Sequence, residues 1–99
     1  MFIVNVAINT EKIAAEKLRD MLVKHQEWFL EQAEQKNFLL VGPYMDWEAA
    51  GIIITRTMKR EELEAILAQD VFHAEGLASY DVHEFKAVKI LPAILKEQV

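Results

Sequence analysis

The chain has no cysteine among its 99 residues, and this absence excludes several kinds of chemistry. Disulfide bonds, thiolate nucleophiles and zinc sites built on cysteine all require that residue. No apolar run approaches the roughly 20 residues that a membrane-spanning helix needs. The apolar N-terminus also lacks the basic start and small-residue cleavage site of a signal peptide. We therefore expect a cytoplasmic protein that has no membrane partner.

Positive charge is scarce as well. Eleven Lys and Arg residues against 16 Asp and Glu residues give a net charge of −5, and the adjacent basic pair Lys59-Arg60 is followed by a run of acids. Phosphate backbones repel such a chain, so we expect no nucleic-acid partner. The three glycines and two prolines are scattered, and no linker or low-complexity stretch interrupts the sequence. Residues 1–99 are therefore predicted to form a single domain.

Hydrophobic residues, by contrast, make up 53% of the chain. Period-2 and helical spacings of these residues predict six elements, with caps at Asn9-Thr10 for the first helix and a stop at Asn37. In chain order the expected elements are a strand at 2–8, a helix at 11–36, a strand at 38–41 closed by Gly42-Pro43, a strand at 50–57, a helix from 57–59 to about 70–75, and a strand at 78–86. A turn at 44–49 and an apolar-leaning tail at 87–99, interrupted by Pro92, complete the chain.

The order βαββαβ predicts a ferredoxin-like α+β fold, an antiparallel sheet with two helices on one face. The second and third strands are apolar on both faces, as Ile53 against Ile52 and Ile54 illustrates. An antiparallel sheet with one wet face alternates apolar and polar residues instead. The second face therefore needs a cover, and we expect an identical subunit to provide it in a homodimer.

His25 and Asp70 are the best candidates for chemistry. Leu18, Leu22, His25 and Phe29 follow one another by four, three and four residues, which places the imidazole on the inward face of the first helix. Asp70 is four residues after Ile66 and continues the inward face of the second helix if that helix persists. A carboxylate on an apolar face needs a partner, so we expect the two groups to pair.

This pair has two interpretations from the residues alone. His25 and Asp70 form either a general acid–base site or a buried hydrogen bond that holds two helices in register. A metal site is a weaker alternative, because Asp70 and His73 have i, i+3 spacing and His25 offers a third ligand, but no further supporting ligands are identifiable. We predict that no metal binds, and we expect His83 to lie on the surface.

A pocket beside the pair has several candidate residues. Gly42 and Pro43 are able to form a rim at which backbone approaches a ligand. The aromatic residues Trp28, Tyr44 and Trp47 are able to line an apolar pocket, although isolated aromatics more often belong to a core or an interface.

The residues His25, Gly42-Pro43 and Asp70-Val71-Phe72, followed by Gly76, resemble the YciI-like (YCII-related) family in order and spacing. That family carries a helical His, a Gly-Pro after the second strand, and Asp-Pro-Phe/Tyr followed by Gly. The resemblance implies a dimeric α+β barrel with a His–Asp pair in a cleft as the site, carried here by His25 and Asp70, and it adds Phe72 to the pocket.

Two positions depart from this pattern. Leu22 stands where the family often has Arg, which removes an anion-binding group and argues against an acidic substrate, and Val71 replaces the family's Pro. We predict a small-molecule enzyme in which Asp70 orients His25 and His25 moves a proton, in isomerase, lyase or dehydrohalogenase chemistry that needs no cofactor. The alternative is a non-catalytic dimeric binding or accessory module in which the pair is structural.

Overall fold

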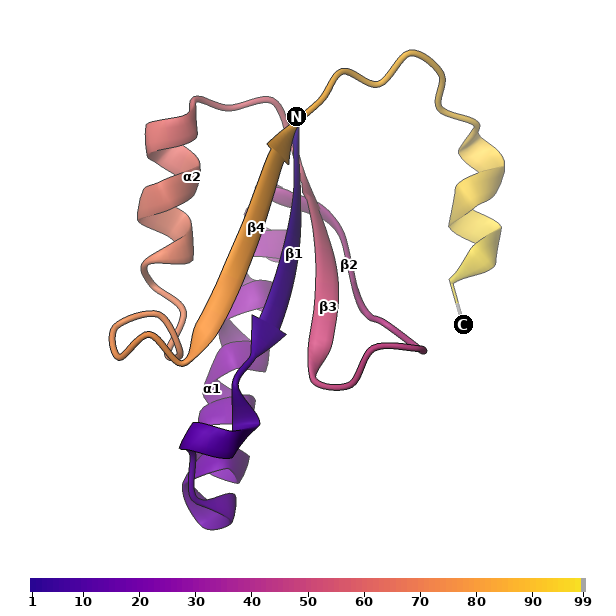
Figure 1. The fold of residues 1–99 in the computed structure, drawn as a ribbon. Coiled ribbons are helices and arrows are strands. Elements are labelled where there is room, and N and C mark those ends of the chain that lie inside the picture. Colours follow the sequence, from indigo (N-terminus) through magenta and orange to yellow (C-terminus); the bar gives the residue numbers. More distant parts are fainter. Residues whose placement is uncertain (99) are drawn as a thin grey trace.

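The computed structural model describes residues 1–98 and confirms the expected α+β fold (Figure 1). The elements are β1 (Phe2–Ile8), α1 (Ala15–Glu34), β2 (Phe38–Pro43), β3 (Ala50–Thr55), α2 (Arg60–Leu67) and β4 (Ala78–Glu84), with short 3-10 helices η1 (Thr10–Lys12) and η2 (Pro92–Glu97). All neighbouring strands pair antiparallel in one sheet of order β2-β3-β1-β4. Both α-helices cover the same face of this sheet, which is the ferredoxin-like arrangement.

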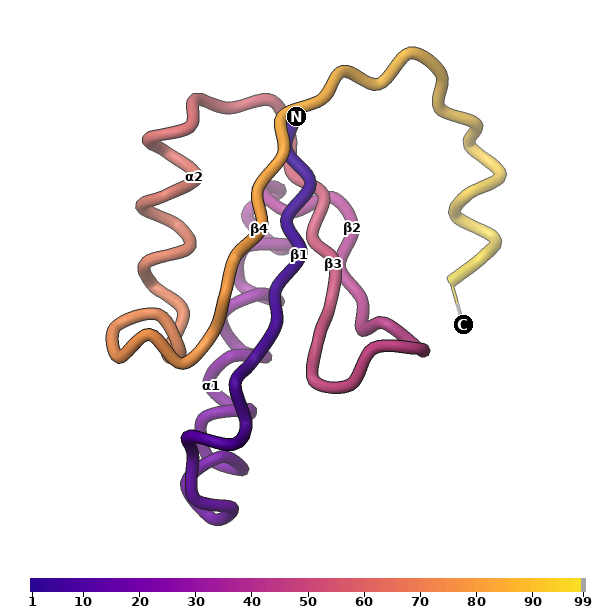
Figure 2. The backbone as a smooth tube through the Cα atoms, viewed as in Figure 1, coloured from indigo at the N-terminus to yellow at the C-terminus, as the bar shows by residue number. Residues whose placement is uncertain are grey.

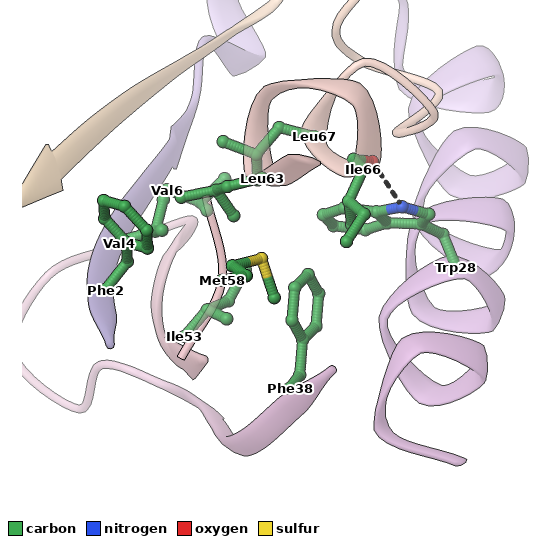
Figure 3. Packing of buried hydrophobic residues seen from close by; sticks show 10 residues of the cluster. All are labelled: Phe2, Val4, Val6, Trp28, Phe38, Ile53, Met58, Leu63, Ile66 and Leu67. Carbon is green, nitrogen blue, oxygen red and sulfur yellow. Dashed lines mark hydrogen bonds between the residues drawn. The ribbon is translucent and has the colours of Figure 1, made fainter. Parts of the chain in front are cut away.

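The core lies between that sheet face and the two helices. Alternate residues of β1, beginning with Phe2 and Val4, are buried against α2, whose inward face carries Leu63 and Ile66 (Figure 3). The indole Nε1 of Trp28 donates a 3.1 Å hydrogen bond to the backbone carbonyl of Ile66, which links α1 to α2. Burial of these side chains supplies most of the driving force for folding.

The other sheet face carries the alternate residues of the same strands. Ile54 of β3 pairs with Ile3 of the neighbouring strand β1 and with Leu40 of the other neighbouring strand, β2. Leu40 is 36% exposed in the single chain, and Ile3 and Ile54 are partly exposed. This face, called the open face below, turns away from both helices (Figure 2).

The first helix begins later than its sequence pattern predicts. Residues 10–12 form η1, and Ile13 then adopts extended angles (φ −127°, ψ 128°), so α1 starts at Ala15 without a side-chain cap. The predicted caps at Asn9-Thr10 were therefore wrong for α1. The predicted stop was wrong by one residue, because Lys36 and not Asn37 takes the left-handed conformation (φ 66°) that ends the helix.

Two further predictions concern the cellular location and the end of the chain. Among residues 1–98 no helix combines the length and the apolar character needed to cross a membrane, and the cytoplasmic location stays a prediction. Val99, the last residue of the predicted domain and tail, lies outside the described residues.

We predict that β3 requires glycine at position 51. A Cβ atom at Gly51 would lie 2.9 Å from the backbone carbonyl oxygen of Gly42 in β2, whereas a Cβ at Gly42 meets no atom within 4 Å. Gly51→Ala should therefore destabilise the protein by about 1–3 kcal/mol, because two hydrogen-bonded strands must separate. Gly42→Ala is the matched control and should change stability by less than about 1 kcal/mol. Urea unfolding of both variants tests this, and equal losses would contradict it.

Candidate functional site

The side chains of His25 and Asp70 meet, as their positions in the sequence predict. His25 Nδ1 lies 2.7 Å from Asp70 Oδ1, with the imidazole 14% exposed and the carboxylate fully buried. His25 comes from the middle of α1, while Asp70 comes from the connection between α2 and β4. The contact therefore joins two segments that are 45 residues apart in the sequence.

Asp70 reaches this position without a continuous helix. The α-helix α2 ends at Leu67, but the amide of Gln69 donates to the carbonyl of Ile66 and the amide of Asp70 donates to that of Leu67. These i to i−3 hydrogen bonds prolong the helical turn more tightly. The carboxylate therefore stays on the inward side although the sequence-based condition, a persisting helix, is not met.

Tyr80 of β4 is a member of this site that the sequence reasoning missed. Its hydroxyl donates a 2.6 Å hydrogen bond to Asp70 Oδ2. The inward position of Tyr80 on β4, opposite Val6 of β1, follows from strand alternation and was the available signal. Nothing in the sequence alone, however, indicates which inward residue of β4 contacts Asp70.

The hydrogen bonds define the protonation pattern of the site. A carboxylate accepts hydrogen bonds, so we assign the proton of the His25–Asp70 contact to Nδ1, and the hydroxyl of Tyr80 donates to the other oxygen. Burial of the phenol raises the pKa of Tyr80 above its ordinary value near 10, and the hydrogen bond to Asp70 and the charge of that carboxylate raise it further. The hydrogen bond of His25 to Asp70 uses Nδ1, and the same side chain also lines the pocket described below.

Three aromatic rings pack against the imidazole of His25. Three rings have centroids between 5.4 and 5.6 Å from that of His25: Trp28, Phe29 and Phe72. Such tilted and edge-to-face contacts are favourable and restrict rotation of the imidazole. The polar end of His25 is thus fixed by Asp70, and its ring is fixed by its apolar neighbours.

His25 also lines a pocket of about 550 Å³ between α1 and the edge of the sheet formed by β2 and β3. The walls are largely apolar, with Phe29, Val41 and Ile53 among them. His25 is the one ionisable side chain among the described lining residues, which also include the amides of Gln26 and Gln98. This arrangement suits a small apolar ligand that presents one proton-bearing group to the imidazole.

The predicted pocket residues divide into two groups. Gly42 and Pro43 line the pocket. Trp28 does not, because its indole is buried in the core and bonded to Ile66. Phe72 is fully buried behind the imidazole and contacts His25 instead of the pocket. Trp28 and Phe72 therefore lie in the core beside the imidazole and are not among the residues that line this pocket.

Tyr44 lies on the open face, away from this pocket. Its hydroxyl donates to the side-chain oxygen of Asn5, and its ring stacks on Trp47 at 5.4 Å. The turn after β2 thus directs Tyr44, and Trp47 with it, toward the open face, and neither residue is among those that line the pocket.

The remaining histidines lie outside the site. His73 is exposed, with its ring 5.4 Å from that of Tyr80, and His83 is exposed on β4 beside Asp81. No group of three or more His, Asp or Glu side chains with metal-binding geometry occurs within the part of the chain that the structure describes. The weaker alternative of a shared metal at His25, Asp70 and His73 has no such cluster to support it.

Comparison with known proteins adds a family and a fold. A family model described as the YCII-related domain matches residues 1–86. A solved structure of 5-chloro-2-hydroxyhydroquinone dehydrochlorinase from Burkholderia phenoliruptrix AC1100, in complex with 2,5-dihydroxybenzoquinone, is similar with a TM-score of 0.60. The two chains share 17% identity, and the match covers 87% of this chain and 94% of the other. No curated protein sequence matches the chain significantly.

The raised pKa of Tyr80 predicts that the protein becomes less stable at alkaline pH. Because the pKa of Tyr80 is raised in the folded protein, the unfolded chain releases this proton first, at about pH 10, and stability should fall as the pH rises above that value. Tyr80→Phe should lose about 1–3 kcal/mol at pH 7, since one Asp70 oxygen loses its donor. The gap between wild type and variant should then narrow above pH 10. Urea unfolding between pH 7 and 11 measures this gap, and parallel curves would refute the assignment.

Proposed function

Because the chain belongs to the YCII-related family, we propose that it is a small-molecule enzyme in which His25 transfers a proton and Asp70 orients His25. The observation that supports this proposal best is the 2.7 Å contact between the two groups beside an apolar pocket. A histidine with one nitrogen held by a carboxylate and the other free toward a pocket is the usual arrangement of a general base.

The proposed reaction uses His25 Nε2 as the base. This nitrogen removes a proton from a carbon or oxygen of the bound molecule, and the negative charge of Asp70 stabilises the imidazolium that forms. In an isomerisation the proton returns to another atom of the same molecule. In an elimination the electron pair of the broken C–H bond forms a double bond while a halide leaves with its own electron pair, and His25 then releases the proton to water.

The pocket favours a substrate without strong negative charge. Its described lining includes no Lys or Arg, and Leu22 lines the pocket where many relatives carry Arg by the sequence resemblance. An anionic group would therefore lie among apolar walls without a cation, which is unfavourable. A compact cyclic molecule with hydroxyl, carbonyl or halogen substituents fits both the volume and the chemistry.

The structural neighbour supports elimination as one form of this reaction, since its printed name is that of a dehydrochlorinase. Its identity of 17% leaves the substrate of the present chain open, so the proposal covers isomerase, lyase and dehydrohalogenase reactions on small cyclic compounds without a cofactor. We propose the cytoplasm as its location.

The alternative, a binding or accessory module, is favoured by one observation. Asp70 is fully buried, and its two oxygens join α1 and β4 through His25 and Tyr80. A group in this position stabilises the fold whether or not chemistry takes place at His25.

A homodimer is part of the proposal. Ile3, Ile52 and Ile54 give the open face an apolar character that favours burial against a second copy. Each 100 Å² of apolar surface buried would contribute about 2.5 kcal/mol before the cost of association.

We predict that Ile54→Glu separates the dimer, because it places a charge at the centre of the open face. Met45→Glu is the matched control, since Met45 is 96% exposed in the turn after β2. Sedimentation velocity should give dimers for the wild type and the control and monomers for Ile54→Glu. A wild type that remains monomeric at millimolar concentration would remove the homodimer from the proposal.

The catalytic role of His25 is tested with a paired substitution. We expect His25→Gln to reduce turnover by about 10²–10⁴-fold, because the amide cannot accept and return a proton. His83→Gln is the control, because His83 does not line the pocket; it lies opposite Ile3 on the open face, so sedimentation velocity first confirms that this variant keeps the oligomeric state of the wild type, and it should then retain full activity. Chloride release from 5-chloro-2-hydroxyhydroquinone is the first assay, followed by halogenated and hydroxylated cyclic compounds. Turnover that is unchanged in His25→Gln, or ligand binding without any turnover, would favour the binding module.

A further inference from the structure

The C-terminal segment of residues 87–98, called the arm below, is the part of the chain that the fold has not used. The family model ends at residue 86, so the arm lies beyond the shared domain. It leaves β4, arches away from the sheet and forms η2 (Figure 1). η2 has no buried residue, and the large apolar side chains of the arm are between 51% and 92% exposed: Val88, Ile90, Leu91, Ile94 and Leu95.

The end of the arm nevertheless reaches the His25 pocket. Gln98 is among the lining residues, together with Leu22 and Leu30 of α1 and Pro43 of β2. Leu22 and Leu30 are themselves 42% and 53% exposed, so they form an apolar flank of α1 at the pocket opening. Gln98 therefore places the end of the arm at the pocket opening, whereas the exposed apolar side chains of η2 do not themselves line it.

Charge also matches the arm to this flank. The arm contains Lys89, Lys96 and Glu97 and is net positive, whereas the whole chain is net −5. On α1, Glu27 and Glu34 lie three residues before and four residues after Leu30, and residues at these spacings share a helix face. Arg19 shares the face of Leu22 by the same rule, so the acidic part of the flank is its Leu30 end, and this part suits the basic arm.

We propose that the arm forms the outer wall of the His25 pocket of its own chain and that Gln98 is a specificity-determining residue for the substrate. On this proposal Ile94 and Leu95, which are 51% and 77% exposed in the structure, move onto the flank formed by Leu22 and Leu30 when a ligand binds, and the amide of Gln98 then meets the substrate at the opening. An amide both donates and accepts hydrogen bonds, so it selects apolar molecules that carry a hydroxyl or carbonyl oxygen. That this ligand is a substrate rests on the function proposed above, but the binding tests below do not require turnover.

A crosslink tests which chain supplies the arm. Because the natural sequence has no cysteine, the double substitution Leu22→Cys/Gln98→Cys introduces a single possible pair. Under mild oxidation we expect a bond within one chain, seen as a faster-moving monomer on a non-reducing gel, and Glu75→Cys/Gln98→Cys is the control that should stay open, because Glu75 is exposed in the connection between α2 and β4 and does not line the pocket. A covalent dimer from the Leu22 pair would assign the arm to a second copy and overturn the proposal, as would the absence of any crosslink.

A binding assay tests the wall and Gln98 separately. The probe is N-phenyl-1-naphthylamine, an uncharged dye that fluoresces in apolar pockets. Ile94→Glu/Leu95→Glu should raise its dissociation rate at least about tenfold, whereas Met45→Glu should leave the rate within about twofold. Gln98→Ala should reduce the preference for 1-naphthol over naphthalene, measured by displacement of the dye, by about fivefold, as expected for the loss of one hydrogen bond.

The binding and turnover assays distinguish a wrong proposal about the arm from a wrong proposal about the enzyme. Unchanged dissociation in the arm variant together with an unchanged naphthol preference in Gln98→Ala overturns the arm, even if turnover still depends on His25. Arm effects that persist while no turnover depends on His25 refute the enzyme and leave the wall in place.

Discussion

The buried carboxylate of Asp70 is the constraint on which the rest of the structure depends. An ionised carboxylate in an apolar core is destabilising by several kcal/mol unless its oxygens accept hydrogen bonds. Here one oxygen accepts from His25 of α1 and the other from Tyr80 of β4. The two donors must therefore converge on the connection after α2, and this requirement joins the packing of three segments to the position of one imidazole.

The same constraint separates the polar and apolar parts of the site. Because the carboxylate is fully buried and does not line the pocket, it is out of direct reach of a ligand there, and His25 is the side chain that connects it to the pocket. The pocket walls are mostly hydrocarbon, so the imidazole works in surroundings of low polarity, where the charge of a nearby carboxylate has a larger effect than in water. A single ionisable group with a fixed orientation follows from this division and is well suited to moving one proton.

The sequence predicts those features that follow from periodicity and from the need to satisfy a buried charge. β1 appears at its expected bounds, and His25 meets Asp70 from two inward positions, one on α1 and one on the tight turn that follows α2. Periodicity does not predict the local backbone conformation at the ends of elements. The helix predicted from residue 11 begins only at Ala15, because Thr10–Lys12 form a 3-10 turn and Ile13 and Ala14 are extended.

The contacts that individual side chains make were the harder part of the site to predict. Trp28 belongs to the core because a large ring with one donor finds an apolar site and a free carbonyl at Ile66, a pairing that only the packing of α1 on α2 creates. Tyr80 escaped notice for the converse reason: a strand tyrosine has no sequence signal for its partner. Residues that share one element can be placed by period, whereas contacts between elements require the crossing geometry of those elements. The arm follows the same rule, since it has no period that assigns it to the domain, and the closeness of Gln98 to Leu22 emerges only when the chain is folded.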